Sequence, residues 1–140
     1  MTIEKNSPNV DPVVALVDDD KVFQLIASRT IKATHLTDKI LQFTNGMEAI
    51  EYLQNNAENN DALPDILFLD INMPIIDGWM FMEDFINLKH RVKKIIRIYM
   101  VSSSIDPRDI ERARSMTDIR EYVIKPISQD KFAQMISNVA

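Results

Sequence analysis

The sequence contains no cysteine and only two glycines, Gly46 and Gly78. Without cysteine, the chain can form no disulfide, no thiolate metal site and no cysteine nucleophile. Two isolated glycines also exclude a phosphate-binding loop of the kind that is built from several glycines. The fold must therefore rest on a hydrophobic core, and any phosphate chemistry must use groups other than a glycine-rich loop.

Long apolar runs and an excess of basic residues are absent as well. No hydrophobic run approaches the roughly 20 residues that span a bilayer, and the polar segment at residues 1–11 lacks the apolar centre of a signal peptide. The chain has 21 acidic and 16 basic residues, a formal charge of −5, which argues against nucleic-acid binding through a general basic field. We therefore expect a cytoplasmic protein that neither inserts into a membrane nor binds nucleic acid, with a flexible tail at residues 1–11.

At 140 residues and 46% hydrophobic composition, the chain has the size of one globular domain, which we expect over residues 12–140. Short apolar runs alternate with stretches of helical period. Five of these runs are predicted strands: Val13–Val17, Ile40–Phe43, Ile66–Leu69, Ile95–Val101 and Glu121–Ile124. They lack strict period-two alternation, which is typical of strands that are buried on both faces of a parallel sheet.

The stretches between these runs predict five helices. They cover about Lys21–Lys32, a segment that opens at Asn45, about Gly78–Lys89, a segment that starts near Asp106, and about Gln129–Asn138. In the first helix, the residues Val22, Ile26, Ala27 and Ile31 lie near one stripe, which we expect to face the core. Five strand–helix units predict an α/β fold, a three-layer sandwich with a parallel sheet covered on both faces.

Polar side chains follow all five predicted strands, and those after the second, Thr44 and Asn45, carry no charge. In such sheets, ligands bind beyond the carboxyl ends of the strands. The residues there are Asp18, Asp19 and Asp20 after the first strand, Asp70 after the third, Ser102, Ser103 and Ser104 after the fourth, and Lys125 after the fifth. Clustered carboxylates repel each other by about 4 kcal/mol per pair at 4 Å and an effective dielectric near 20. Lys125 and a divalent cation would offset this repulsion, and the all-oxygen ligands favour magnesium, with manganese or calcium as alternatives.

With these residues in place, the chain resembles the receiver domains of two-component response regulators, especially the small single-domain regulators of the chemotaxis type. The matching segments are Leu16–Asp20, Leu67–Pro74, Asp77-Gly78, Met100–Ser103 and Tyr122–Pro126, spread over residues 13–140. The resemblance implies a flavodoxin-like, doubly wound sheet with the strand order 2-1-3-4-5. That order places the first strand beside the third, so that Asp18 and Asp19 converge with Asp70.

The resemblance also implies roles for these residues. Asp70 would accept a phosphoryl group from a phosphohistidine on a histidine kinase or a histidine phosphotransfer protein. A magnesium ion, or manganese, would be held by Asp18, Asp19, Asp70 and the backbone carbonyl of Asn72, and Lys125 would pair with Asp70. Ser102 and Tyr122 would form the switch, and the peptide bond between Lys125 and Pro126 would be cis. No role is implied for Asp20.

The expected output is a change of the surface formed by the fourth helix, the fifth strand and the fifth helix, where an unidentified output protein would bind. We expect a stand-alone signalling domain, a monomer or weak dimer, that is not a turnover enzyme and either binds a target or relays the phosphoryl group onward.

Three alternatives fit the sequence less well. A phosphatase of the haloacid dehalogenase type needs a second aspartate two positions after the nucleophile, where this chain has Asn72. A flavodoxin-like nucleotide binder needs a Ser/Thr/Gly loop after the first strand to hold phosphate, and three aspartates there would repel it. A degenerate receiver that acts as a scaffold would have lost part of the acidic site, which is intact here.

Overall fold

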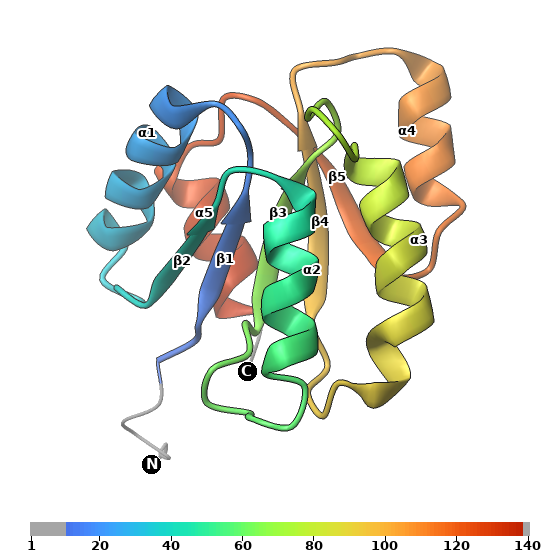
Figure 1. Ribbon diagram of the computed structural model, residues 1–140. Coiled ribbons are helices and arrows are strands. Elements are labelled where there is room, and N and C mark those ends of the chain that lie inside the picture. The colour runs from blue at the N-terminus through green and yellow to red at the C-terminus, as the bar shows by residue number, and fades with distance from the viewer. Residues whose placement is uncertain (1–10, 139–140) are drawn as a thin grey trace.

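The computed structural model describes residues 11–138, so the predicted flexible tail lies outside the described residues except for Asp11. The strands are β1 (Val14–Val17), β2 (Ile40–Phe43), β3 (Ile66–Asp70), β4 (Arg97–Ser102) and β5 (Ile119–Ile124). The helices are α1 (Lys21–Ala33), α2 (Gly46–Asn55), α3 (Gly78–Leu88), α4 (Pro107–Arg114) and α5 (Gln129–Ser137), and a short 3-10 helix, η1 (Lys89–Arg91), follows α3. All strand pairs are parallel, in the order β2-β1-β3-β4-β5 (Figure 1). The predicted fold class and strand order are confirmed.

The side chains of each central strand alternate between two cores, one on each face of the sheet. In β1, Val14 and Leu16 pack into the core beneath α1 and α5, and Ala15 and Val17 pack into the core beneath α2 and α3. Helices α1 and α5 lie together on one face, while α2, α3 and α4 cover the other (Figure 1). The strands therefore bury both faces, which explains why their sequences are almost continuously apolar.

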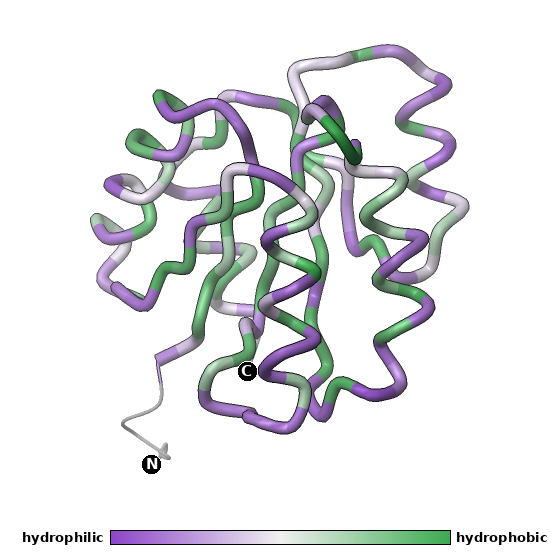
Figure 2. Tube along the Cα trace, viewed as in Figure 1, coloured by the Kyte–Doolittle hydropathy of each residue, from purple (hydrophilic) through white to green (hydrophobic). Residues whose placement is uncertain are grey.

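The helices are amphipathic in the way that this three-layer arrangement requires. Figure 2 shows the turns of each helix alternating between hydrophobic and hydrophilic segments. Each of the five α-helices also has a side-chain cap at its first turn, as with Asn45 for α2, whose Oδ1 accepts a hydrogen bond from the Glu48 backbone N–H at 2.8 Å. Such caps satisfy N–H groups that have no partner within the helix. Element ends are thus set by local polar residues, and packing by the apolar face.

Two sets of sequence predictions are corrected by the structure. Strand β4 begins at Arg97, where its pairing with Ile66 of β3 begins, and Ile95 is 89% exposed outside it; β5 begins two residues before its predicted start. The inward stripe predicted for α1 was wrong in part, because Val22 and Ile26 are 65% and 58% exposed. The buried residues of this helix are Gln24, Ala27 and Ile31. Their spacing of three and four residues is that of one helix face, and the prediction missed it because it counted apolar residues only.

The register of the strands brings their carboxyl ends to one level. Val17 of β1 lies beside Leu69 of β3, so the residues that follow each, Asp18 and Asp70, are neighbours. Asp70 in turn lies beside Val101 of β4. At the end of β5, the backbone N–H of Lys125 donates to the carbonyl of Ser102 at 2.9 Å. The fold therefore places four strand ends, with their polar side chains, at one edge of the sheet.

Gly78, the first residue of α3, holds the loop after β3 closely against the strand end. Its N–H donates to the Ile71 carbonyl at 2.8 Å, and a Cβ added at this position would lie 2.6 Å from the Asp70 carbonyl oxygen. We expect Gly78→Ala to lower the free energy of unfolding by about 1–3 kcal/mol, because backbone atoms next to Asp70 must move.

Gly46→Ala is the matched control, since Gly46 is the first residue of α2. A Cβ there would meet side-chain atoms of Ile76 at 2.8 and 2.9 Å, and a side chain can move aside. Urea unfolding of both variants should therefore show a smaller loss for Gly46→Ala. Equal losses would mean that the contact with the Asp70 backbone is not what restricts Gly78.

Candidate functional site

Three carboxylates meet at this edge of the sheet. Asp18, Asp19 and Asp70 each offer an oxygen atom, and these atoms all lie within 4.8 Å of one another. Asp18 and Asp70 are 1% and 7% exposed, whereas Asp19 is open to solvent. The convergence expected from the strand order is therefore present, with two acids buried and one at the surface.

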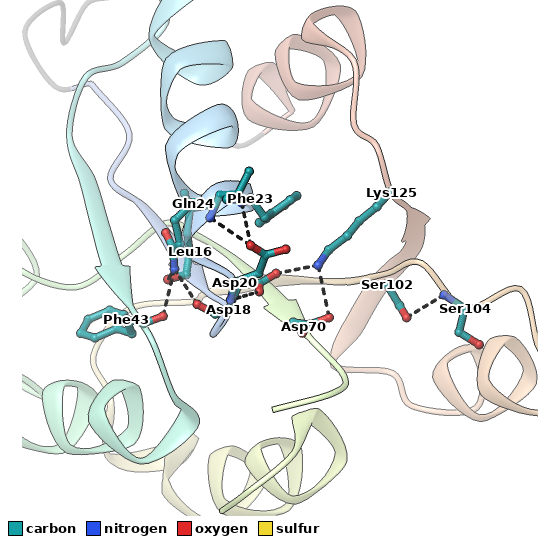
Figure 3. A network of polar contacts seen from close by, with 11 residues as sticks. Leu16, Asp18, Asp20, Phe23, Gln24, Phe43, Asp70, Ser102, Ser104 and Lys125 are labelled. Carbon is teal, nitrogen blue, oxygen red and sulfur yellow. Dashed lines mark hydrogen bonds and ion pairs between the residues drawn. The ribbon is translucent and has the colours of Figure 1, made fainter. Parts of the chain in front are cut away.

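The turn between β1 and α1 is built by the acidic residues themselves. The Asp18 carboxylate accepts a hydrogen bond from the backbone N–H of Asp20 at 2.9 Å. Asp20 caps α1, because its Oδ1 accepts from the N–H groups of Val22 and Phe23 at 2.9 and 3.2 Å (Figure 3). Asp20, for which the resemblance implied no role, thus has a structural one as a helix N-cap.

Lys125 contacts two of the carboxylates from the end of β5. Its Nζ donates to Oδ2 of Asp18 at 2.8 Å and lies 3.6 Å from Oδ1 of Asp70 (Figure 3). The sequence prediction paired Lys125 with Asp70, and the structure places Asp18 nearer. Burial lowers the pKa of Lys125, but the hydrogen bond to Asp18 and the charge of Asp70 outweigh it and leave the pKa above its ordinary value. The ammonium group is therefore charged at neutral pH. The peptide bond that follows it, to Pro126, is cis, as the resemblance implied.

The positive charge of Lys125 alone does not balance the negative charge of this cluster, as the pKa of Asp70 indicates. Burial and the neighbouring charge of Asp18 raise the pKa of Asp70 from 3.8 to about 6, although Lys125 acts in the opposite direction. At neutral pH the Asp70 carboxylate is therefore ionised at a cost in free energy, and a further cation beside it would reduce that cost. The donors are oxygens only, a set that fits Mg²⁺ or Mn²⁺. Asn72, whose backbone carbonyl was predicted as a further ligand, lies two residues after Asp70 in the loop that follows β3.

The raised pKa of Asp70 predicts how stability depends on pH without a divalent cation. The folded state binds the Asp70 proton more tightly than the unfolded chain does. The stabilisation that this bound proton gives the folded state is therefore complete below about pH 4, and it is lost as the pH rises through about 6. Asp70→Asn removes the titrating group. In urea unfolding with EDTA, the variant should therefore gain about 2–3 kcal/mol over wild type between about pH 4 and pH 7. A difference between the two proteins that does not change with pH would contradict this account.

The two predicted switch residues are joined through Ser104, in the loop between β4 and α4. Ser102 is fully buried at the end of β4, and its Oγ accepts a hydrogen bond from the Ser104 N–H at 3.0 Å. The Tyr122 hydroxyl donates to the Ser104 carbonyl at 2.8 Å. The Ser104 hydroxyl in turn donates to Asp109 of α4 at 3.0 Å. Figure 3 shows the Ser102 hydroxyl turned toward Ser104, so one loop residue links the strand end, the tyrosine and helix α4.

Sequence reasoning missed two residues that hold this site, Ser104 and Gln24. The sequence placed Ser104 in the serine run after the fourth strand, but it did not predict the hydrogen bonds by which Ser104 joins Ser102, Tyr122 and α4. Gln24 is buried in α1, and its amide group hydrogen-bonds backbone carbonyls around the acidic turn. Its spacing from Ala27 and Ile31 was the available signal, since all three lie on one helix face.

Comparisons with known proteins agree with this geometry. The model of the response regulator receiver domain family matches residues 14–137. The chain is 30% identical over 135 residues to the sensor histidine kinase CheAY of Helicobacter pylori, a match that covers 96% of this chain and 16% of the kinase. It is 25% identical over 130 residues to the probable methanogenesis regulatory protein FilR2 of Methanothrix harundinacea, covering 92% of this chain and 82% of that protein.

Solved structures give the same result. A two-component response regulator from Cytophaga hutchinsonii superposes with a TM-score of 0.83 at 31% identity, covering 91% of this chain and 95% of that one. A response regulator receiver protein from Dyadobacter fermentans gives a TM-score of 0.77 at 27% identity, covering 90% and 95%. Within residues 11–138, no helix has the length and apolar character needed to cross a membrane. The family match over nearly the whole described chain, at the domain that carries the acidic cluster, shows that this protein belongs to the response regulator receiver domain family of two-component signalling.

Proposed function

We propose that the protein accepts a phosphoryl group on Asp70 from a phosphohistidine of a histidine kinase or a histidine phosphotransfer protein. The observation that carries this proposal is the placement of Asp70. It ends β3 within the cluster of three carboxylates, with the charged Lys125 ammonium 3.6 Å from its Oδ1. A carboxylate in that position is a nucleophile surrounded by groups that can bind the oxygens of an incoming phosphoryl group.

In the proposed transfer, a carboxylate oxygen of Asp70 bonds to phosphorus while the bond from phosphorus to the donor imidazole nitrogen breaks, and the electron pair returns to the imidazole. Asp18, Asp19, Asp70 and the Asn72 carbonyl would hold a magnesium ion, which neutralises charge on the phosphoryl oxygens when bound. Lys125 would exchange its contact with the Asp18 carboxylate for one with a phosphoryl oxygen. The Lys125 side chain would have to move only a short way, because its Nζ already lies between the carboxylates of Asp18 and Asp70.

The signal would pass through the loop between β4 and α4. The Ser102 hydroxyl would turn from the Ser104 N–H toward the phosphoryl group, and the loop would follow. The Tyr122 hydroxyl donates a hydrogen bond to the Ser104 carbonyl, so the tyrosine side chain would move with the loop. The surface formed by α4, β5 and α5 would then change. The changed surface would bind an output protein, or the domain would relay the phosphoryl group onward.

Labelling of the wild-type protein tests the proposal and separates it from a phosphatase. With acetyl phosphate and Mg²⁺, we expect a gain of one phosphoryl group by intact mass, and none when EDTA is present. Hydrolysis of p-nitrophenyl phosphate should stay near background, because Asn72 supplies no carboxyl group to act as acid and base. Labelling that ignores chelation, or turnover of this ester at enzyme rates, would contradict the proposal.

A further inference from the structure

Gln24 is a buried polar side chain on the face of α1 that packs against the sheet. It is 6% exposed, and its Nε2 lies 3.2 Å from the Leu16 carbonyl oxygen, 3.1 Å from that of Asp18 and 3.0 Å from that of Phe43. Leu16 and Asp18 belong to the end of β1 and the residue after it, and Phe43 ends β2. One amide group therefore ties α1 to the ends of two neighbouring strands (Figure 3).

The oxygen atom of the same amide group has no hydrogen-bond partner. Among residues 11–138, the Gln24 Oε1 is buried and accepts no hydrogen bond. Burying an acceptor without a donor costs free energy, and an apolar side chain of the same length would avoid that cost. Exchanging the amide oxygen and nitrogen does not help, because the three carbonyls need a donor. The benefit of glutamine at this position must therefore come from its NH₂ group.

The contact with Asp18 acts directly on the acidic turn. The Asp18 carbonyl is part of the peptide unit between Asp18 and Asp19, so a hydrogen bond to it sets the orientation of that unit. The orientation of the unit in turn sets the direction in which the Asp19 side chain leaves the backbone. Asp18 is held from the other side as well, because its N–H donates to the Phe43 carbonyl at 3.0 Å. Gln24 thus restrains the turn that carries two of the three carboxylates.

We propose that Gln24 is a positioning residue for the divalent cation, holding the peptide between Asp18 and Asp19 so that both carboxylates face the ion before it binds. The inference rests on the proposed function, which assigns the ion to this cluster. Groups that orient metal ligands typically contribute about 10- to 100-fold to metal affinity. Gln24 itself contacts neither the ion nor the phosphoryl group in this proposal.

Calorimetric titration of Gln24→Met with Mg²⁺ tests the inference. Methionine keeps the length and removes both polar atoms. We expect the Kd for Mg²⁺ to rise about tenfold or more. The rate of labelling by acetyl phosphate should fall at low Mg²⁺ and recover at saturating Mg²⁺, which a general loss of structure would not produce. The unfolding midpoint in EDTA should change by only a few degrees, because the variant loses the hydrogen bonds to the three carbonyls but also loses the buried acceptor without a partner.

Gln42→Met is the matched control. Gln42 is an exposed glutamine of β2 whose Nε2 donates to the backbone carbonyl of Gln24 at 3.3 Å, so it lies nearby without touching the acidic turn. Its Kd for Mg²⁺ should stay within about twofold of wild type, because it orients no ligand. A folded Gln24→Met variant that binds Mg²⁺ as tightly as wild type would overturn the inference.

If Gln24→Met does not fold, the wild-type protein supplies the test by nuclear magnetic resonance. The side-chain NH₂ signals of Gln24 should shift on addition of Mg²⁺ and saturate together with the Asp19 backbone amide, while those of Gln54, exposed on α2, should not. Unchanged Gln24 signals at saturation would overturn the inference. Wild-type protein that neither binds Mg²⁺ nor is labelled would overturn the proposed function as well, which distinguishes the two failures.

Discussion

Asp70→Asn is expected to abolish labelling by acetyl phosphate in the presence of Mg²⁺. Asparagine has nearly the same shape, but its neutral amide is not a nucleophile toward phosphorus. The variant should remain folded, because the substitution removes a carboxylate whose pKa is raised by burial and by the charge of Asp18. Intact mass after incubation should therefore show one added phosphoryl group on wild type and none on the variant.

Asp20→Asn is the control for that experiment. Asp20 belongs to the same acidic segment but is exposed and caps α1, a task that asparagine performs equally well. This variant should be labelled like wild type. If Asp70→Asn still gains a phosphoryl group, the acceptor is another residue and the mechanism proposed above is wrong.

Lys125→Met is expected to have the second large effect, on stability and on transfer together. Among the described residues, Lys125 provides the only ion-pair contacts to Asp18 and Asp70. Removing one partner of a buried ion pair leaves uncompensated charge and costs about 3–5 kcal/mol. We expect a loss near the lower end of that range, about 3 kcal/mol at pH 7 in EDTA, because the Lys125 side chain is 17% exposed and water can enter the space that it leaves. Saturating Mg²⁺ should reduce the loss, since the ion supplies positive charge to the same carboxylates.

The rate of labelling should also fall in Lys125→Met, by about 100-fold or more at saturating Mg²⁺, because a charged donor to the phosphoryl oxygens is gone. Lys131→Met is the matched control. Lys131 forms an ion pair of 2.7 Å with Glu121, but these side chains are much more exposed, at 31% and 45%, than those of Lys125 and Asp18, at 17% and 2%. Exposed pairs contribute about 0–1 kcal/mol, so this variant should keep nearly full stability and labelling. Similar losses in both lysine variants would show that the position of Lys125 between the acids has no special effect.

The architecture and the location of the site were predictable from the sequence. Strands buried on both faces are nearly continuous in apolar residues, so each polar residue that ends a run, such as Asp70, marks a strand end. Because the strands are parallel, these ends gather at one edge of the sheet, and the family resemblance supplied the strand order that makes Asp18 and Asp70 neighbours.

The finer geometry was not predictable because it depends on tertiary contacts. Side-chain packing at the end of β5 decides which of the two carboxylates lies nearer to the Lys125 ammonium group. The Lys125 Nζ also lies 4.3 Å from the centre of the Phe23 ring. The spacing of Gln24 from Ala27 and Ile31 indicates the buried face of α1, but its partners are backbone carbonyls, which a pattern of side chains does not reveal. Ile95 was assigned to β4 on its apolar character, although it lies outside the strand and in solvent.

Chemical trapping of the phosphorylated residue in wild-type protein tests the central claim most directly. After incubation with acetyl phosphate and Mg²⁺, borohydride reduces an aspartyl phosphate to homoserine, and mass spectrometry of the peptides locates the change. We predict homoserine at position 70 and at no other position. Homoserine at position 18 or 19, or a phosphoryl group on a serine or histidine with Asp70 unchanged, would contradict the assignment of Asp70 as the phosphoryl acceptor.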